Sequence, residues 1–192
     1  MSPQRIDYCD SPEAPRANSL VPSVNVLVVN DVGEILLIRR TDNGNWAVPG
    51  GAIDLGESVA QAAVRETLEE SGIECAITGT VGIYSDPRHV ILCTGNGEAQ
   101  QEFSIVLTAR PVGGQPTPSS ESSEVRWVPE SELPGYTMDR SMRIPVVRVS
   151  VQRMVTSAND LIRRRSCPTH TEETVGRERK QLQSSVSGRE AP

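Results

Sequence analysis

Aromatic side chains are scarce in this sequence of 192 residues, of which they make up only 3%. Proteins that hold single-stranded nucleic acids without reading their sequence stack the bases on aromatic rings, so few platforms for such stacking exist here. The formal net charge is −6, and an acidic protein is a poor non-specific ligand for nucleic acids because it repels their phosphates. We therefore expect no nucleic acid among the partners of this protein.

Several other patterns are missing as well. The sequence has two histidines, His89 and His170, which argues against a Ser-His-Asp triad. Its four cysteines form no Cys-x-x-Cys pair and no Cys/His zinc spacing, a pattern typical of reduced thiols in a cytoplasm. No apolar run reaches about 18 residues, and the N-terminal residues lack the apolar core of a signal peptide. These features predict a cytoplasmic protein that does not enter a membrane.

The length predicts one globular domain with additional segments at its ends. Residues 1–21 are polar and rich in proline, which indicates a loose segment with at most a short strand. Residues 22–164 carry the apolar runs and form the predicted domain. Residues 165–192 are rich in Ser, Glu and Arg with few core formers, so we expect a disordered tail.

The pattern of apolar residues predicts strands, one helix, further strands and a final helix, which together indicate an α/β fold. Two runs that are apolar on both faces, 24–30 and 34–40, flank an Asp-Val-Gly turn and predict a hairpin in a covered sheet. The further predictions are strands at 46–48 and 125–128, an extended segment at 73–85, a hairpin of 90–94 with 102–110, a turn-forming loop at 86–89, a flexible loop at 113–124, a helical turn at 129–133 and a helix at 138–164. Within 102–110, we expect Phe103, Ile105 and Leu107 to face the core.

Residues 51–73, GAIDLGESVAQAAVRETLEESGI, concentrate acidic side chains behind a glycine turn. Glu57, Glu66, Glu69 and Glu70 lie close together, with Arg65 among them. Carboxylates so close repel one another unless a cation neutralises them. This crowding predicts a divalent metal site of the kind used in phosphate chemistry.

The expected helix in this segment has clear signals at both ends. Ser58 and Gln61 form a capping-box pattern, and Gly72 suits the left-handed position after the last turn. At about 100° per residue, Glu66 and Glu70 lie in line and can present oxygens to one point. The same geometry turns Val64 and Leu68 elsewhere, and we expect these two side chains to be buried in the core.

This segment resembles the sequence box of the Nudix hydrolase family, which reads Gly, five residues, Glu, seven residues, then Arg-Glu-U-x-Glu-Glu-x-Gly-U, where U is a bulky aliphatic residue. The positions in register are Gly51, Glu57, Arg65, Glu66, Glu69, Glu70, Gly72 and Ile73. The one departure is Thr67 at the first U position. Thr67 is β-branched and close to Val in size, so we expect a packing adjustment and no loss of metal binding.

The resemblance implies an α/β/α sandwich with a mixed β-sheet and a Mg²⁺ cofactor, with Mn²⁺ as a possible substitute. It implies that Glu66 and Glu70 are the main metal ligands, that Gly51 adds a carbonyl ligand and that Glu69 assists them. Glu57 and Arg65 would hold the loop and the helix in place. We accordingly expect the catalytic group to comprise Glu57, Arg65, Glu69 and Glu70. Many relatives dimerise, so a homodimer is a possible assembly.

Charged residues outside the box are candidates for binding substrate. Arg39 and Arg40 end a predicted strand that should point toward the box, and Arg88 could contact a phosphate. His89 could hydrogen-bond a ribose or a base, although residues 86–89 are more typical of a surface turn. Glu102, on the other face of a predicted strand, is a fourth candidate for contacting the substrate, after Arg39, Arg40 and Arg88. For the group that orients the attacking water, the sequence leaves three candidates open: Glu102, Glu121 and Glu124. Trp46 and Trp127 are more typical of core residues than of base-stacking platforms.

The predicted reaction is Mg²⁺-dependent hydrolysis of the pyrophosphate bond in a nucleoside diphosphate derivative, a small molecule such as ADP-ribose or a nucleotide sugar. The stretches 82–91 and 102–111 look like those of relatives that cleave such compounds. Pro87 falls one position short of the spacing after the box found in many ADP-ribose-cleaving members. Hydrolysis of nucleoside triphosphates and a non-catalytic nucleotide-sensing module therefore remain the alternatives.

Overall fold

The computed structural model describes residues 5–143, which fall within one compact unit of the chain, Met1–Ser150. The elements in chain order are β1 (Arg5–Cys9), β2 (Ser23–Val28), β3 (Ile35–Arg40), β4 (Trp46–Ala47), β5 (Gly50–Ala52), α1 (Val59–Ser71), β6 (Ile73–Cys93), β7 (Glu98–Gly114), β8 (Ser122–Val128) and the 3-10 helix η1 (Glu130–Gly135). In this part of the chain, no helix is both long and apolar enough to cross a membrane.

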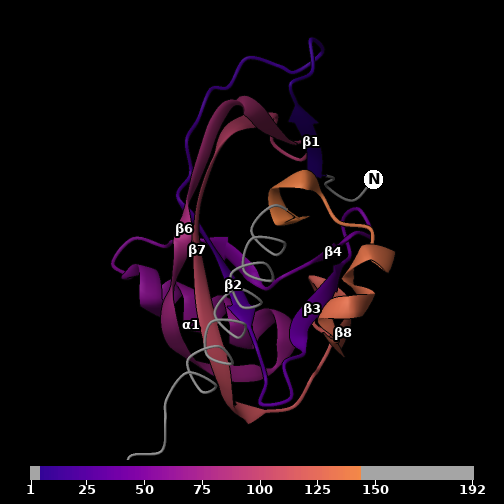
Figure 1. Ribbon diagram of the computed structural model, residues 1–192. Coiled ribbons are helices and arrows are strands. Elements are labelled where there is room, and N and C mark those ends of the chain that lie inside the picture. Colours follow the sequence, from indigo (N-terminus) through magenta and orange to yellow (C-terminus); the bar gives the residue numbers. More distant parts are fainter. Residues whose placement is uncertain (1–4, 144–192) are drawn as a thin grey trace, which may run out of the picture. The chain divides into compact units, whose positions relative to one another are not determined.

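The strands form two sheets, and the larger one is mixed (Figure 1). The five-stranded sheet has the order β1-β6-β7-β2-β5, in which β2 and β7 are parallel and the other neighbours are antiparallel. The three-stranded sheet has the order β4-β3-β8 and is antiparallel. The predicted α/β class with a mixed sheet is therefore confirmed. The predicted helix at 138–164 and the tail at 165–192 lie mostly or wholly outside the described residues.

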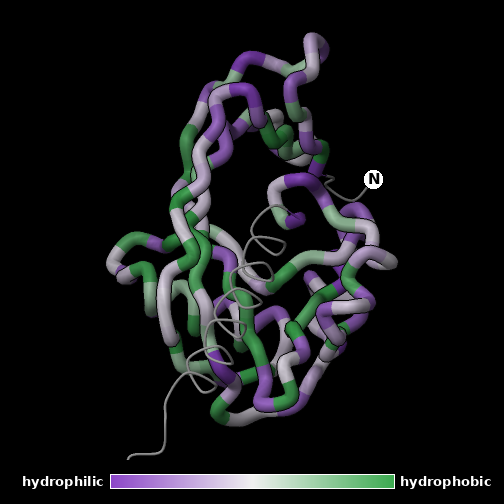
Figure 2. Tube along the Cα trace, viewed as in Figure 1, coloured by the Kyte–Doolittle hydropathy of each residue, from purple (hydrophilic) through white to green (hydrophobic). Residues whose placement is uncertain are grey.

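Strands β2 and β3 form the centre of the core, and both are covered on both faces as the sequence predicts. Val24, Val26 and Val28 pack with Leu36 and with helix α1 in one cluster. Leu27 belongs to a second cluster with residues of β3 and β8. Figure 2 shows hydrophobic stretches along these central strands. Burial of alternating side chains in two different clusters explains why these strands read as continuous apolar runs.

The predicted hairpin between these two strands is wrong. β2 lies in the five-stranded sheet and β3 in the three-stranded sheet. Their ladder is limited to a bridge between Val29 and Ile35 next to a bond from the Asn30 amide to the Glu34 carbonyl. The two strands diverge from this turn because the two sheets pack face to face, so that each buries the apolar side chains of the other.

Helix α1 has the predicted limits. Ser58 and Gln61 form the capping box, and Gly72 adopts the left-handed conformation with φ of 71°. The side that meets the sheet carries small residues, with Ala62 and Ala63 fully buried. This close contact turns Val64 and Leu68 outward, and their exposed fractions of 36% and 46% contradict the predicted burial.

Thr67 occupies the position at which the family box has a bulky aliphatic residue, and it is fully buried on the packed side of α1. Its hydroxyl donates a hydrogen bond to the carbonyl of Ala63 over 2.7 Å. This bond removes most of the cost of burying a hydroxyl group. Thr67 thus fits its site without an unsatisfied polar group.

Strands β6 and β7 form one long hairpin that spans the sheet, and its turn contains Gly97 with φ of 73°. The hairpin is much longer than predicted. Residues 86–89 do not form a separate turn-forming loop as expected, because they belong to β6 as a bulge in a continuous strand. The loop expected at 113–124 is shorter, since β7 continues to Gly114 and β8 begins at Ser122.

The expected core face of β7 is also partly wrong. Phe103 and Ile105 are half-buried, whereas Glu102, Ser104 and Val106 are buried. Both faces of this strand are covered: Ile105 packs toward the cluster that contains α1, and Val106 packs toward the second sheet. Toward Glu102, the inner face borders a polar cleft.

Candidate active site

A polar cleft of about 340 Å³ lies where the glycine strand β5, helix α1 and strands β2 and β7 meet. Glu66, Glu69, Glu70 and Arg65 line it from the helix, and Gly50 and Gly51 line it from β5. These residues come together because β5 pairs with β2, and α1 packs against both strands. The acidic segment predicted from the sequence therefore opens into a cavity.

Glu70 is the most deeply buried carboxylate in this cleft, with 4% of its surface exposed. Its Oε2 accepts a hydrogen bond from the Gly50 amide over 2.8 Å. Burial raises the pKa of Glu70 to about 7, although the Gly50 amide and the charge of Arg40 act in the opposite direction. The negative charge of Glu70 is therefore poorly compensated by the protein, and a bound cation would stabilise it.

Arg65 is a hub that holds the other carboxylates of the segment. Its Nε and Nη2 donate to the two oxygens of Glu57 over 2.7 and 2.8 Å. Its Nη1 donates to Glu66 over 2.8 Å and to Glu69 over 3.1 Å. The bond to Glu57 lowers the pKa of that carboxyl. This network fixes the directions of three carboxylates and ties the loop before the helix to the helix itself.

The residues present fit a divalent metal. Glu66 and Glu70 lie one helical turn apart and both line the cleft. A Cβ at position 51 would lie 2.4 Å from Oε1 of Glu66, so glycine leaves the space that the carboxylate occupies. Burial raises the pKa of Glu66, although Arg65 acts against this, so a cation would stabilise this charge too.

Within residues 5–143, no three His, Cys, Asp or Glu side chains are grouped to hold a metal by themselves. A metal bound to Glu66 and Glu70 would take its remaining ligands from backbone carbonyls, water and substrate. Mg²⁺ is commonly bound in this way, by one or two carboxylates together with waters and substrate phosphates. The hard oxygen donors of this site thus suit Mg²⁺ or Mn²⁺.

The structure brings two of the four predicted substrate-binding residues into the cleft. Arg40 lines the cleft, and its guanidinium donates to Asp42 over 3.0 and 2.6 Å. Glu102 also lines it. Arg39 is not among the cleft residues. Arg88 borders a neighbouring cavity, and its side chain is 71% exposed.

The three candidates for the water-orienting glutamate also separate. Glu102 and Glu121 line the cleft, whereas Glu124 does not. Glu124 instead accepts a 2.7 Å hydrogen bond from Arg39 and a further one from Arg126. Of the three candidates, Glu102 and Glu121 therefore border the cleft and Glu124 does not.

The two tryptophans occupy structural positions. The ring of Trp46 meets that of Tyr136 edge-on at 5.0 Å between centroids, and the guanidinium of Arg126 lies 5.3 Å above it. Trp127 packs against the core cluster that contains α1. Neither residue borders the cleft, as expected from the sequence.

The sequence did not reveal several cleft residues. Arg5 lines the cleft, although it lies in the segment expected to be loose. Asn25 on β2 donates a hydrogen bond to the Ser104 hydroxyl on β7. The signal for Asn25 was visible, because it is the one polar residue within the apolar run 24–29. No comparable local signal marks Arg5.

Comparisons with known proteins agree with this geometry. A family model described as NUDIX domain matches residues 19–148. A putative 8-oxo-dGTP diphosphatase of Bacillus subtilis is 32% identical over 118 residues, which cover 62% of this chain and 72% of that protein. An ADP-ribose pyrophosphatase of Methanocaldococcus jannaschii is 32% identical over 120 residues, which cover 58% of this chain and 64% of that protein.

A solved structure gives the same result for the fold. The crystal structure of a MutT protein from Methanosarcina mazei Go1 superposes with a TM-score of 0.55 at 26% sequence identity. The superposition covers 74% of this chain and 99% of that one. The mixed sheet and its helix are therefore shared with a known structure over most of the described residues.

Proposed function

Because the chain belongs to the Nudix hydrolase family, we propose that it hydrolyses the pyrophosphate bond of a nucleoside diphosphate derivative with Mg²⁺ as its cofactor. ADP-ribose or a nucleotide sugar is the substrate class that we favour. The observation that carries the proposal is the buried, poorly compensated carboxylate of Glu70 beside Glu66 and the glycine strand, at the floor of a polar cleft.

The chain's own residues prepare the site in two ways. The Gly50 amide holds Glu70, and Arg65 holds Glu66 and Glu69, so the carboxylates are oriented before a ligand arrives. When bound, a divalent metal would offset charge on the phosphate oxygens and lower the pKa of a coordinated water. Glu121 offers oxygens that can accept a hydrogen bond from a water, and Glu102, from the opposite wall, offers oxygens that can accept hydrogen bonds from the substrate.

The shape of the cavity supports a substrate with a group on each side of the pyrophosphate. The cleft adjoins a second cavity of about 240 Å³, and the two share Glu102 and Ser141. A nucleoside triphosphate would need only the part of the cleft beside Glu66 and Glu70 for its phosphates and one further space for its nucleoside. A diphosphate derivative carries a second polar group, for which the adjoining cavity offers space.

Hydrolysis of nucleoside triphosphates is the second candidate, and one comparison favours it. The Bacillus subtilis relative is named a putative 8-oxo-dGTP diphosphatase and is as similar to this chain as the relative named an ADP-ribose pyrophosphatase. Both reactions break a phosphoanhydride bond beside a metal. The two candidates therefore differ only in the groups that flank the pyrophosphate.

The test is a substrate panel with Mg²⁺ that contains ADP-ribose, a nucleotide sugar, dGTP and 8-oxo-dGTP. Products are separated by chromatography: a diphosphate derivative yields a mononucleotide and a second monophosphate, and a triphosphate yields pyrophosphate. Glu70→Gln should fold and lose about 100-fold or more in turnover. Glu132→Gln, the same change at an exposed position of η1, should retain the parental rate.

Three outcomes would contradict the proposal. Glu70→Gln turning over at the parental rate would remove Glu70 from the site. Cleavage of triphosphates alone would establish the second candidate. Nucleotide binding in calorimetry without cleavage of any compound on the panel would indicate a sensing module.

A further inference from the structure

A bulge in β6 turns His89 toward the interior, beside the cleft. The ladder with β7 pairs Asp86 with Glu102 and then Val90 with Gln101. Residues 87–89 thus have no counterpart on β7. A bulge re-aims side chains, and here it places the His89 side chain, 6% exposed, against that of Glu102. On its other edge, β6 pairs His89 with Cys9 of β1.

His89 lies between two carboxylates that come from different strands. Its Nδ1 lies 2.7 Å from Oε2 of Glu102, a hydrogen-bond distance. Its Nε2 lies 3.7 Å from Oδ2 of Asp7 on β1, which is an ion-pair distance. Asp7 in turn accepts a 3.0 Å hydrogen bond from Nε of Arg5. The four side chains alternate in charge, and both end members, Arg5 and Glu102, line the cleft.

The charge of His89 follows from these neighbours. Burial disfavours the imidazolium, but Asp7 and Glu102 outweigh burial and raise the pKa of His89 to about 9. Asp86 of the same strand is a third acidic neighbour. The basic groups nearby are Arg5, through Asp7, and Arg88 and Arg140, which border the adjoining cavity.

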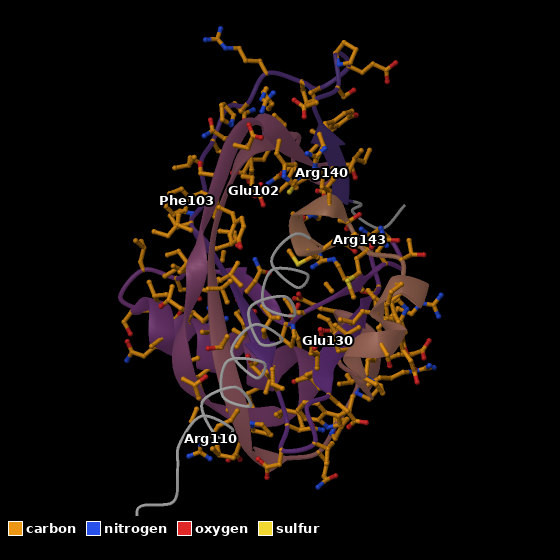
Figure 3. The ribbon with its side chains drawn as sticks, in the orientation of Figure 1. Glu102, Phe103, Arg110, Glu130, Arg140 and Arg143 are labelled. Atoms are coloured by element: carbon orange, nitrogen blue, oxygen red, sulfur yellow. The ribbon has the colours of Figure 1, made fainter. Side chains whose placement is uncertain are left out.

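Glu102 stands apart from the proposed metal end of the cleft. Ser23 of β2 pairs with Ala52 of β5 on one edge and with Ser104 of β7 on the other. Two strand spacings, about 10 Å, therefore separate β5 from β7, and Glu102 lies two residues further along β7. Figure 3 shows Glu102 and Phe103 on opposite sides of this strand. Glu102 can thus meet a part of the substrate that is remote from the pyrophosphate.

We propose that His89 is a positioning residue that holds the Glu102 carboxylate in one orientation in the cleft wall, where it accepts hydrogen bonds from hydroxyl or amino groups of the substrate. This inference rests on the proposed function. It also means that β1 contributes to the active site, because Asp7 of β1 and Glu102 of β7 hold the His89 ring between them. We call this arrangement the clamp. Without the imidazolium, the backbone of β7 still places Glu102 in the cleft wall, but no hydrogen bond from His89 fixes the orientation of its carboxylate.

The kinetic test compares His89→Gln with His170→Gln, the same replacement at a position outside the described residues. His89→Gln retains an amide donor but no charge. Loss of a charge-assisted hydrogen bond that orients a binding group should raise KM about 10-fold and leave kcat within about 3-fold. Glu102→Gln should raise KM similarly, and the double variant should add little. His170→Gln should leave both constants unchanged.

The pH profile separates positioning from a merely structural role. In the parental protein, KM should rise above about pH 9 as His89 loses its proton, and His89→Gln should not show this rise. An unchanged KM for His89→Gln, with a raised KM for Glu102→Gln, would overturn the proposal. If His89→Gln fails to fold, Asp7→Asn provides the second variant, with the same expected rise in KM and the same deciding outcome.

A measurement that does not need turnover distinguishes this inference from the proposed function. The chain has two histidines, so NMR titration of the imidazole resonances, with His170→Gln for assignment, reports on His89 directly. We expect His89 to titrate well above 6.5 and to shift downward in Glu102→Gln. Titration near 6.5 would overturn the clamp even in an active enzyme. Absence of all hydrolysis with the expected titration would instead contradict the proposed function.

Discussion

The adjacent glycines of β5 should respond in opposite ways to the same substitution. A Cβ at Gly51 would lie 2.4 Å from Oε1 of Glu66, which is the far end of a flexible side chain and is held by a hydrogen bond from Arg65. An ordinary contact needs at least 3.4 Å, so the carboxylate must move by about 1 Å. A Cβ at Gly50 would lie 2.2 Å from the Val24 carbonyl oxygen and 2.8 Å from Cα of Asn25, both parts of the backbone.

These distances set the expected magnitudes. For Gly51→Ala, a misplacement of about 1 Å at a reacting site costs about 100-fold in turnover, while rotation of Glu66 keeps the change in unfolding free energy below about 1 kcal/mol. For Gly50→Ala, the sheet itself must shift, and overpacking of this kind costs about 1–3 kcal/mol. Gly51→Ala should thus impair function without much loss of stability, whereas Gly50→Ala should lose stability.

The assay measures turnover with Mg²⁺ for both variants and urea unfolding followed by circular dichroism. Calorimetric titration with Mn²⁺ adds a readout of the metal site, and Gly51→Ala should weaken binding. Gly135→Ala is the matched control, since a Cβ there meets nothing within 4 Å. The reasoning is refuted if Gly51→Ala keeps turnover and Mn²⁺ affinity within about 3-fold of the parent.

Three further predictions follow from the same structure. Arg65→Lys should lower turnover about 10-fold with little change in stability, because one ammonium group cannot reproduce the fork that orients several carboxylates; steady-state kinetics and a thermal melt measure both. Gly72→Ala should lower the unfolding free energy by about 2 kcal/mol in urea, because this residue has φ of 71°. The Asp7–His89 ion pair should make the unfolding free energy depend on pH. The pKa of Asp7 is about 2, because its contacts with His89 and Arg5 outweigh burial, so its contribution is present above pH 3.8 and is lost as the pH falls to 2. The pKa of His89 is about 9, so its contribution is present below pH 6.5 and is lost as the pH rises to 9. The unfolding free energy measured in urea should therefore fall by about 2 kcal/mol below pH 4 and by about 2 kcal/mol above pH 6.5. In Asp7→Asn, the unfolding free energy should depend less on pH in both ranges.

Features set by neighbours along the chain were predictable from the sequence. The limits of α1 depend on Ser58 and Gly72, which act within one turn of the helix. The alignment of Glu66 with Glu70 follows from helical periodicity alone. The acidic cleft could therefore be assembled in outline from residues 51–73.

Features that depend on distant segments were not predictable in this way. Whether Val64 is buried depends on which strands α1 meets, and the small residues Ala62 and Ala63 decide that contact. An apolar run such as β2 specifies burial on both faces but not its ladder partner, so the sequence does not predict that β2 and β3 lie in different sheets. The inward turn of His89 depends on a bulge whose register requires both β1 and β7.

The place of β2 between β5 and β7 has a consequence for engineering this enzyme. Its ladders fix the span between the glycine strand and the outer wall of the cleft, so β2 sets a distance that side-chain substitutions on the cleft face of β7 leave unchanged. Substrate selectivity can then be redesigned by substituting single side chains on β7, while the proposed metal site beside β5 keeps its geometry.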